Sequence, residues 1–273
     1  MNYIDIDVSL KESKSKILVG LPSFIVSILK KIIHQNELNQ ILEEFKDSEG
    51  VDFHNKVIER LNLTLEIEGI ENLPENSRCF FASNHPFGVV DGLVLTKTVC
   101  DKYGTFRAIG NDAFMFIPNL RPYIASVNVY GSSSKESILA LNKIYNSDLP
   151  ITHFPAGKVS RLIHWKVRDT DWQKSFITKA ISSQRDIVPF YFYGRNSNLF
   201  YAVNMIRRIL FIKTNLELSL LPHEFFNKKN KTIRVRIGKP VSYKKFDTSS
   251  THQQWAQYMR GHVYSLRDNK SIS

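Results

Sequence analysis

The chain has 273 residues, of which 42% are hydrophobic and 23% charged, a composition typical of a folded protein with one large α/β domain. Its formal net charge of +11 suits anionic partners such as a bilayer surface or an acidic carrier protein. The basic residues are spread along the chain with no run of five or more, so we expect no nucleic-acid partner.

Targeting signals and disulfides are not expected in this chain. Its first fifteen residues are polar and include acidic side chains, and no apolar stretch reaches the roughly 20 residues that span a bilayer. Cys79 and Cys100 are the only cysteines and lack the spacing of a metal site. Reduced, buried thiols are therefore expected, consistent with a cytoplasmic environment.

The first apolar segment covers residues 17–33 and has helical spacing, with Pro22 where a first-turn proline is tolerated. Serine, lysine and histidine side chains lie on one side of this helix and apolar side chains on the other. A basic-rimmed apolar helix can lie in a membrane interface, although the same stripe could pack on the protein's own sheet. The residues predicted to contact a membrane are Phe24, Ile25, Ile28, Leu29, Lys30 and Lys31.

Two more helices are expected at 38–45 and 51–61, and strands then alternate with helices. The expected strands are 64–68, 78–83, 106–109, 124–129, 151–154, 187–193, 216–220 and 232–237, and the expected helices are 91–102, 135–146, 171–184 and 252–266. This order predicts an α/β fold with a mostly parallel central sheet flanked by helices and preceded by N-terminal helices. We divide it into a helical membrane-docking region, 1–62, and a single catalytic domain, 63–273.

Segment 84–92, Asn-His-Pro-Phe-Gly-Val-Val-Asp-Gly, stands where an apolar strand turns into an apolar helix. It places the imidazole of His85 a few residues from the carboxylate of Asp91. A carboxylate bound to one ring nitrogen leaves the other nitrogen free as a base, which a hydroxyl nucleophile needs to attack a thioester. Asp91 could instead be only a helix N-cap, and His85 a turn histidine that is satisfied locally.

Segment 153–161, His-Phe-Pro-Ala-Gly-Lys-Val-Ser-Arg, also follows an apolar strand. Its proline and glycine would open backbone N–H groups, and Lys158, Ser160 and Arg161 add donors suited to phosphate or carboxylate. The alternative is a basic turn exposed to solvent. The sequence has no Gly-x-Ser-x-Gly elbow and no His-Glu-x-x-His motif, so neither a serine hydrolase of that type nor a metal site is expected.

The two segments lie about seventy residues apart and resemble the glycerolipid acyltransferase superfamily, which includes lysophosphatidic acid acyltransferases. That superfamily carries Asn-His-x4-Asp in its first block, Phe-Pro-Glu-Gly-Thr-Arg-Ser in its third and Val-Pro-Val in its fourth, which here is Ile-Val-Pro-Phe at 187–190. In this chain five residues separate His85 from Asp91, and Ala156 replaces the acidic residue of the third block. The second-block arginine has no clear counterpart within 110–131.

These departures are similar to those of the hemolysin-like bacterial branch, which carries Asn-His-Pro-x-Gly-x-x-Asp-Gly and Phe-Pro-Ala-Gly-Glu-Val-Ser. That branch includes O-acyltransferases of lyso-ornithine and lyso-glycine lipids, and the resemblance covers roughly residues 20 to 245. Lys158 stands where the branch usually has glutamate. Because a cation and an anion select opposite partners, the acceptor headgroup is left open.

The resemblance implies a peripheral O-acyltransferase at the cytoplasmic face of the bacterial inner membrane. His85 would take the proton from a lyso-lipid hydroxyl while Asp91 holds the ring, and the hydroxyl would attack the thioester of acyl carrier protein or coenzyme A. Backbone N–H groups near Gly88 or Gly157 could stabilise the oxyanion, and no metal or bound cofactor is implied. The substrate-binding residues would be Asn84, Phe87, Gly88, Phe154, Pro155, Gly157, Lys158, Ser160 and Arg161. A catalytically silent lipid-binding protein and a thioesterase on the same fold stay open as alternatives.

Overall fold

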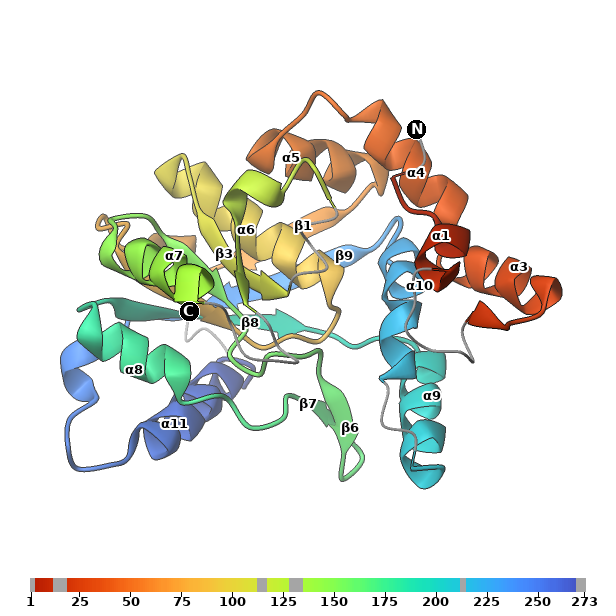
Figure 1. Cartoon of the computed structure of the whole chain (residues 1–273). Helices are drawn as coiled ribbons and strands as arrows, with labels where there is room; N and C mark the ends of the chain where they lie inside the picture. The colour runs from red at the N-terminus through yellow and green to blue at the C-terminus, as the bar shows by residue number, and fades with distance from the viewer. Residues whose placement is uncertain (1–2, 12–18, 112–116, 128–134, 212–214, 269–273) are drawn as a thin grey trace.

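A seven-stranded sheet forms the centre of the structure, a computed structural model that describes residues 3–11, 19–111, 117–127, 135–211 and 215–268. Its strand order is β1-β9-β8-β2-β5-β3-β4 (Figure 1). All neighbouring strands of this sheet are parallel except β8 and β9, which are antiparallel. The strands are β1 (Thr64–Glu68), β2 (Cys79–Ser83), β3 (Arg107–Asn111), β4 (Ile124–Val127), β5 (Ile151–His153), β8 (Asp186–Tyr193) and β9 (Thr232–Ile237). The predicted α/β class with a mostly parallel sheet is confirmed.

Helices cover both faces of this sheet (Figure 1). They are α5 (Gly50–Arg60) and α6 (Val89–Tyr103) on one face, with α7 (Lys135–Asn146), α8 (Ser175–Ser182) and α11 (His252–Ser265) on the other. In β8, Val188 and Phe190 face the core under α5 and α6, whereas Ile187 faces the opposite core, and all three are fully buried. Coverage of both faces explains the unbroken apolar runs of β2 and β8. Cys79 and Cys100 are buried here as free thiols, as predicted.

The N-terminal helices include one exposed helix and two that belong to the core. No residue of α3 (Ser23–Ile32) is buried, whereas Ile41 of α4 (Gln35–Glu44) and Val57 of α5 lie in the same core cluster as the sheet. The helix predicted over 17–33 begins at Ser23, after Pro22 as the N-cap, while residues 17 and 18 lie outside the described part. Within the described ranges, no helix combines the length and the apolar content needed to cross a bilayer.

Several elements differ from the sequence-based expectation. Residues 216–220, predicted as a strand, form instead a 3₁₀ helix, which buries Glu217 against Arg161 and Arg207. The helix predicted over 171–184 begins only at Ser175, and the strand predicted over 124–129 ends at Val127, beyond which residues 128 and 129 lie outside the described part. The sequence pattern does not predict α1 (Ile6–Lys11), α9 (Asn198–Ile209), α10 (Leu221–Phe226) or the hairpin of β6 (Arg161–Ile163) and β7 (Lys166–Arg168).

Candidate active site

His85 and Asp91 form a hydrogen-bonded pair in the turn between β2 and α6. His85 Nδ1 lies 2.9 Å from Asp91 Oδ2. Since a carboxylate can only accept, Nδ1 carries the proton and Nε2 is the basic nitrogen. Asp91 is fully buried, whereas the His85 ring is partly exposed, and no residue in the described ranges hydrogen-bonds to Nε2. The imidazole can therefore receive a proton from a bound molecule.

Asp91 is not the N-cap of α6, which is Gly88, but the third residue of the helix, from which its side chain reaches back to the N-cap backbone. Its Oδ2 accepts hydrogen bonds from the backbone N–H groups of Phe87 (2.8 Å) and Gly88 (2.9 Å) as well as from His85. Three donors on one oxygen fix the carboxylate, and with it the ring. Gly88 has a φ of 93°, and a Cβ there would lie 2.8 Å from Leu221 Cδ2, so this tight turn requires glycine.

The second motif meets the first because β2 and β5 are parallel neighbours, with Ala82 opposite His153. Their carboxyl ends therefore lie at the same edge of the sheet. There the ring of Phe154 stacks on the imidazole of His85, with centroids 4.0 Å apart and an interplanar angle of 21°. The backbone N–H of Ser160 donates to the His85 carbonyl at 2.7 Å. The two segments form one site.

Asp169 joins both motifs and is not singled out by the sequence. Its Oδ1 accepts from the His85 backbone N–H (3.2 Å) and from the Ser160 hydroxyl (2.6 Å), and its Oδ2 accepts from Trp172 Nε1 (2.9 Å). The side chain is fully buried, and this burial raises its pKa against the effect of the three hydrogen bonds. In sequence it is one of several acidic residues near a tryptophan, and nothing there signals a buried carboxylate.

Asn84 and Phe87 fasten the turn to the end of β8. The Asn84 amide donates to the Phe192 carbonyl (3.0 Å) and accepts from the Phe192 N–H (2.7 Å), continuing the pairing of β2 with β8 by a side chain. Phe87 is buried, and a Cβ on Gly194 would lie 2.3 Å from its ring. The Nζ atom of Lys228 lies over the Phe87 ring, 4.3 Å from its centroid. Substrate contact by Asn84 and Phe87 stays a prediction.

The predicted anion donors of the second motif lie in different surroundings. Arg161 is buried, donates to the Val159 carbonyl (2.6 Å) and pairs with Glu217 (2.9 Å). Its guanidinium group is therefore bound by other residues inside the protein. The Ser160 hydroxyl is bound to the Asp169 carboxylate, and Pro155 is buried. Lys158 is exposed beside Gly157, and no described residue pairs with its ammonium group. Lys158 is thus the predicted donor that an anionic ligand can reach directly.

The two glycines suggested as oxyanion donors have their own N–H groups engaged. Gly88 N–H donates to Asp91, and Gly157 N–H donates to the Phe154 carbonyl at 2.9 Å. Their role is conformational instead. Gly157 has a φ of 65°, a left-handed conformation that favours glycine, and no atom lies within 4 Å of the position that a Cβ would take.

The residues predicted to contact a membrane lie on α3 in mixed environments. Phe24 is 64% exposed, and Ile28 and Lys31 are also exposed, whereas Ile25 and Leu29 are half-buried. Lys30 forms an ion pair with Asp7. The apolar stripe therefore keeps an uncovered side.

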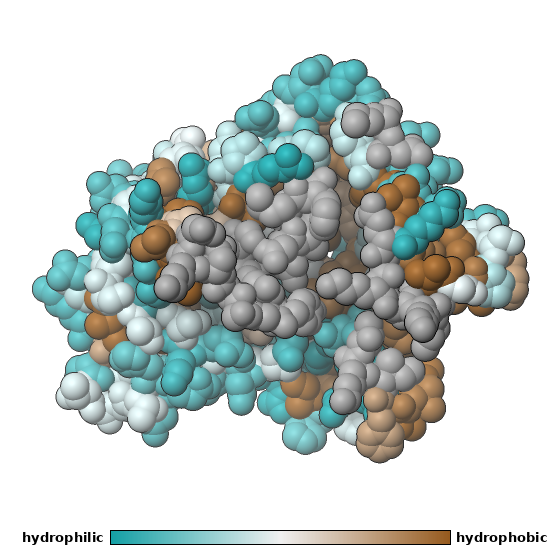
Figure 2. Space-filling view, in the orientation of Figure 1, coloured by the Kyte–Doolittle hydropathy of each residue, from teal (hydrophilic) through white to brown (hydrophobic). Residues whose placement is uncertain are grey.

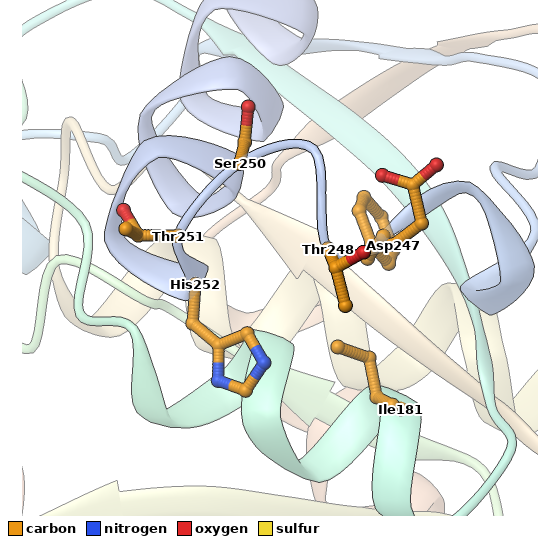
Figure 3. A pocket seen from close by; sticks show the side chains of 7 residues that line it. Ile181, Asp247, Thr248, Ser250, Thr251 and His252 are labelled. Atoms are coloured by element: carbon orange, nitrogen blue, oxygen red, sulfur yellow. The ribbon is translucent and has the colours of Figure 1, made fainter.

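A surface pocket of about 500 Å³ lies elsewhere, between α8 and the N-terminus of α11 (Figure 3). It contains His252, whose Nδ1 lies 2.9 Å from Thr178 Oγ1, and Asp247, which accepts from the backbone N–H of Ser249. No contact joins this histidine to that carboxylate, so the pocket lacks an acid–base pair. Across the described residues, no three His, Cys, Asp or Glu side chains are grouped as a metal site.

In sequence this chain is similar to known acyltransferases. The acyltransferase family model matches residues 9–272. A lyso-glycine lipid O-acyltransferase of Phocaeicola vulgatus is 40% identical over 264 residues, 96% of this chain and 95% of that protein. Another lyso-glycine lipid O-acyltransferase, from Bacteroides thetaiotaomicron, is 39% identical over 264 residues, 96% of this chain and 97% of that protein. The crystal structure of the 1-acyl-sn-glycerophosphate acyltransferase PlsC of Thermotoga maritima aligns with 89% of this chain and 81% of its own at 15% identity and a TM-score of 0.49. The chain therefore belongs to the acyltransferase family that this family model describes, together with the two lyso-glycine lipid O-acyltransferases, and it is an acyltransferase.

Proposed function

We propose that this protein transfers a fatty acyl group from an acyl thioester to the hydroxyl of a lyso-lipid, with His85 as the general base. The observation that carries the proposal is the 2.9 Å bond from His85 Nδ1 to the buried Asp91, which leaves Nε2 basic and partly exposed. The likeness to two lyso-glycine lipid O-acyltransferases supports the reaction class.

In this mechanism the acceptor O–H gives its proton to His85 Nε2 as the oxygen attacks the thioester carbonyl carbon. The C–S bond then breaks, and the departing sulfur takes the proton from the imidazolium. Asp91 stabilises that imidazolium and keeps the ring in one tautomer. Phe154, stacked on the ring at 4.0 Å, restricts its rotation and shields one face from water.

Lys158 favours an acceptor with a carboxylate headgroup. Its exposed ammonium group has no described partner. Lys158 follows Gly157, whose backbone N–H donates to the carbonyl of Phe154. A glycine linked through its nitrogen keeps its carboxylate, which a lysine binds as a point charge. We therefore propose a lyso-glycine-type lipid as the acceptor.

The proposed donor is acyl carrier protein or acyl coenzyme A, both of which are anionic and suited to a chain with a net charge of +11. The proposed location is the cytoplasmic face of the bacterial inner membrane, where α3 would bind peripherally with its uncovered side. Residues 1–62 would thus dock the enzyme, and residues 63–273 would carry the chemistry.

Incubating the purified protein with acyl carrier thioester, with and without lyso-glycine lipid, tests this proposal. Free thiol should appear only when the acceptor is present, together with the diacylated product by mass spectrometry. Equal release without acceptor would indicate a thioesterase, and no release with either thioester donor would indicate a lipid-binding protein.

The variant His85→Ala should lose activity by about 10²–10⁴-fold, because the base is removed. Its thermal unfolding should change little, since the His85 ring is partly exposed. Full activity in a well-folded His85→Ala protein would contradict the mechanism.

A further inference from the structure

Helix α9 carries apolar side chains on two sides, although only one side meets the protein. Its inner side contributes the buried Phe200 and Tyr201 to a small cluster with Val159 and Leu220. The outer side exposes a second apolar set: Leu199, Met205, Ile206, Ile209, Leu210 and Phe211. Figure 2 shows brown surface over α3 and over α9 on the right-hand side of the molecule. Such a large exposed apolar area is unusual for a surface helix.

The hairpin of β6 and β7 adds a tryptophan beside this helix. Its two-residue turn, His164–Trp165, has φ values of 48° and 62°, a type I′ geometry that normally uses asparagine and glycine. Trp165 is 89% exposed at the tip. Indole rings with one apolar and one polar part are enriched at the interface between a membrane and water.

The end of α3, the β6–β7 hairpin and α9 all pack against the same buried cluster. Ile32 at the end of α3, Leu162 and Val167 of the hairpin and Val203 of α9 all pack against the cluster of Val159, Phe200, Tyr201 and Leu220. The same cluster reaches the active-site turn, because a Cβ on Gly88 would lie 3.3 Å from Val159 Cγ2. We call the outer side of α9, Phe211 and Trp165 the α9–hairpin surface.

The chain segments that form this surface carry no acidic side chain of their own; the acids that pair with them, Asp7 with Lys30 of α3 and Glu217 with Arg207 of α9, come from other segments. The sequence contains no Asp or Glu from Ile187 to Leu216, from Leu149 to Arg168, or from Ser13 to Asn36. These three acid-free segments supply α9, the second motif with the hairpin, and α3. Their exposed basic side chains include Lys31, Lys158, Lys166, Arg195 and Arg208. Apolar side chains rimmed by cations complement a bilayer that contains anionic lipids.

We propose that the α9–hairpin surface is a second membrane-contact site, which binds an anionic bilayer together with α3. The inference extends the proposed function, since it brings the His85 turn to the surface in which a lyso-lipid acceptor lies. Phe211, 90% exposed directly after α9, and Trp165 enter the interface, while Arg208 and Lys166 lie at the headgroups. Docking through α3 alone would leave these apolar side chains in water.

The test compares Leu210→Asp with Leu139→Asp in the full chain. Leu210 on the proposed surface and Leu139 on α7 are both 62% exposed, so the two variants make the same chemical change at equal exposure. Binding to vesicles with and without phosphatidylglycerol is measured by flotation. Leu210→Asp and Trp165→Ser should each weaken binding to anionic vesicles by about tenfold, and Leu139→Asp should bind like the wild type.

Equal binding by Leu210→Asp and Leu139→Asp would overturn the inference. So would a loss of dimer in sedimentation of Leu210→Asp with unchanged vesicle binding, which would make this surface an interface between copies of the chain. The proposed function fails separately: wild-type protein that binds vesicles but transfers no acyl group, in vesicles or in detergent, contradicts the activity and leaves the docking surface intact. In detergent micelles, Leu210→Asp should keep wild-type turnover.

Discussion

His85 is held by two buried carboxylates. Asp91 is bonded to its ring, and Asp169 is bonded to its backbone N–H. Asp91 acts on the charge of the imidazole, because its oxygen is bonded to the ring nitrogen itself. Asp169 acts on position, since it ties the backbone of the first motif to the Ser160 hydroxyl of the second. The proposed base, His85, is thus oriented by Asp91, which sequence spacing reveals, and by Asp169, which it does not.

Replacing Asp91 by asparagine should remove the charge that stabilises the imidazolium while keeping the size of the side chain. We expect Asp91→Asn to lower turnover by about 10²–10⁴-fold at saturating acceptor, with the protein still folded. The measurement is thioester release in steady state. Asp171→Asn, at an exposed carboxylate, is the matched control and should keep wild-type turnover. Turnover of Asp91→Asn within a few fold of the control would mean that the pair is only a helix cap.

At the scale of elements, the packing of α5 on α6 places a histidine in the core. His54 of α5 is buried, and its Nδ1 lies 3.2 Å from Thr96 Oγ1 of α6. Burial lowers the pKa of His54 from 6.5 to about 4, so the folded protein keeps this ring neutral over a range in which the unfolded chain binds a proton. The packing of α5 on α6 therefore makes the stability of the protein depend on pH.

The free energy of unfolding should fall as the pH is lowered from 6.5 towards 4, because the unfolded state then binds more protons than the folded state. In His54→Gln, the loss of stability between about pH 7 and about pH 5 should be smaller than in the wild type by about 2 kcal/mol. Urea unfolding at the two pH values measures it. Some dependence should remain, since burial also lowers the pKa of His153 to about 4. If His54→Gln loses as much stability as the wild type over this pH range, groups other than His54 cause the pH dependence.

The apolar runs of β2 and β8 could be predicted because strands covered on both faces need apolar residues at every position. Residues 216–220 alternate apolar and polar side chains as a half-buried strand would, yet they form a 3₁₀ helix in which Glu217 pairs with arginines of two other elements. The hairpin at 161–168 could not be predicted from the sequence either, since its turn uses histidine and tryptophan in place of asparagine and glycine. Glu217 is thus held by side chains of other elements, whereas the hairpin has a turn whose residue types give no hairpin signal.

At the scale of the whole molecule, the core crosses the proposed division at residue 62. Ile41 and Leu42 of α4 and Phe53 and Val57 of α5 lie in one cluster with Ile233 of the sheet. Residues 1–62, proposed to dock the enzyme on a membrane, therefore also have a structural role. Within this region α3, unlike α4 and α5, has no buried residue.

A chain that begins at residue 63 should fail to fold stably, because it exposes the apolar face of the sheet and α6 that α4 and α5 cover. Circular dichroism and thermal unfolding should show no cooperative transition. As the matched control, a chain in which Phe24 and Ile28 of α3 are replaced by serine should unfold like the wild type. A cooperative transition in the shortened chain would show that residues 63–273 are an independent unit.

The sequence by itself determined the fold class, the His85–Asp91 pair and the second motif, since these depend on local periodicity and on residue types at short spacing. Only the tertiary structure decided which donors remain available: it buried Arg161 against Glu217, bound Ser160 to Asp169 and left Lys158 exposed. It also packed α9, the β6–β7 hairpin and the end of α3 against one small cluster of buried side chains. The physical reason is that burial, ion pairing and surface exposure depend on neighbours from distant parts of the chain, which no short pattern encodes.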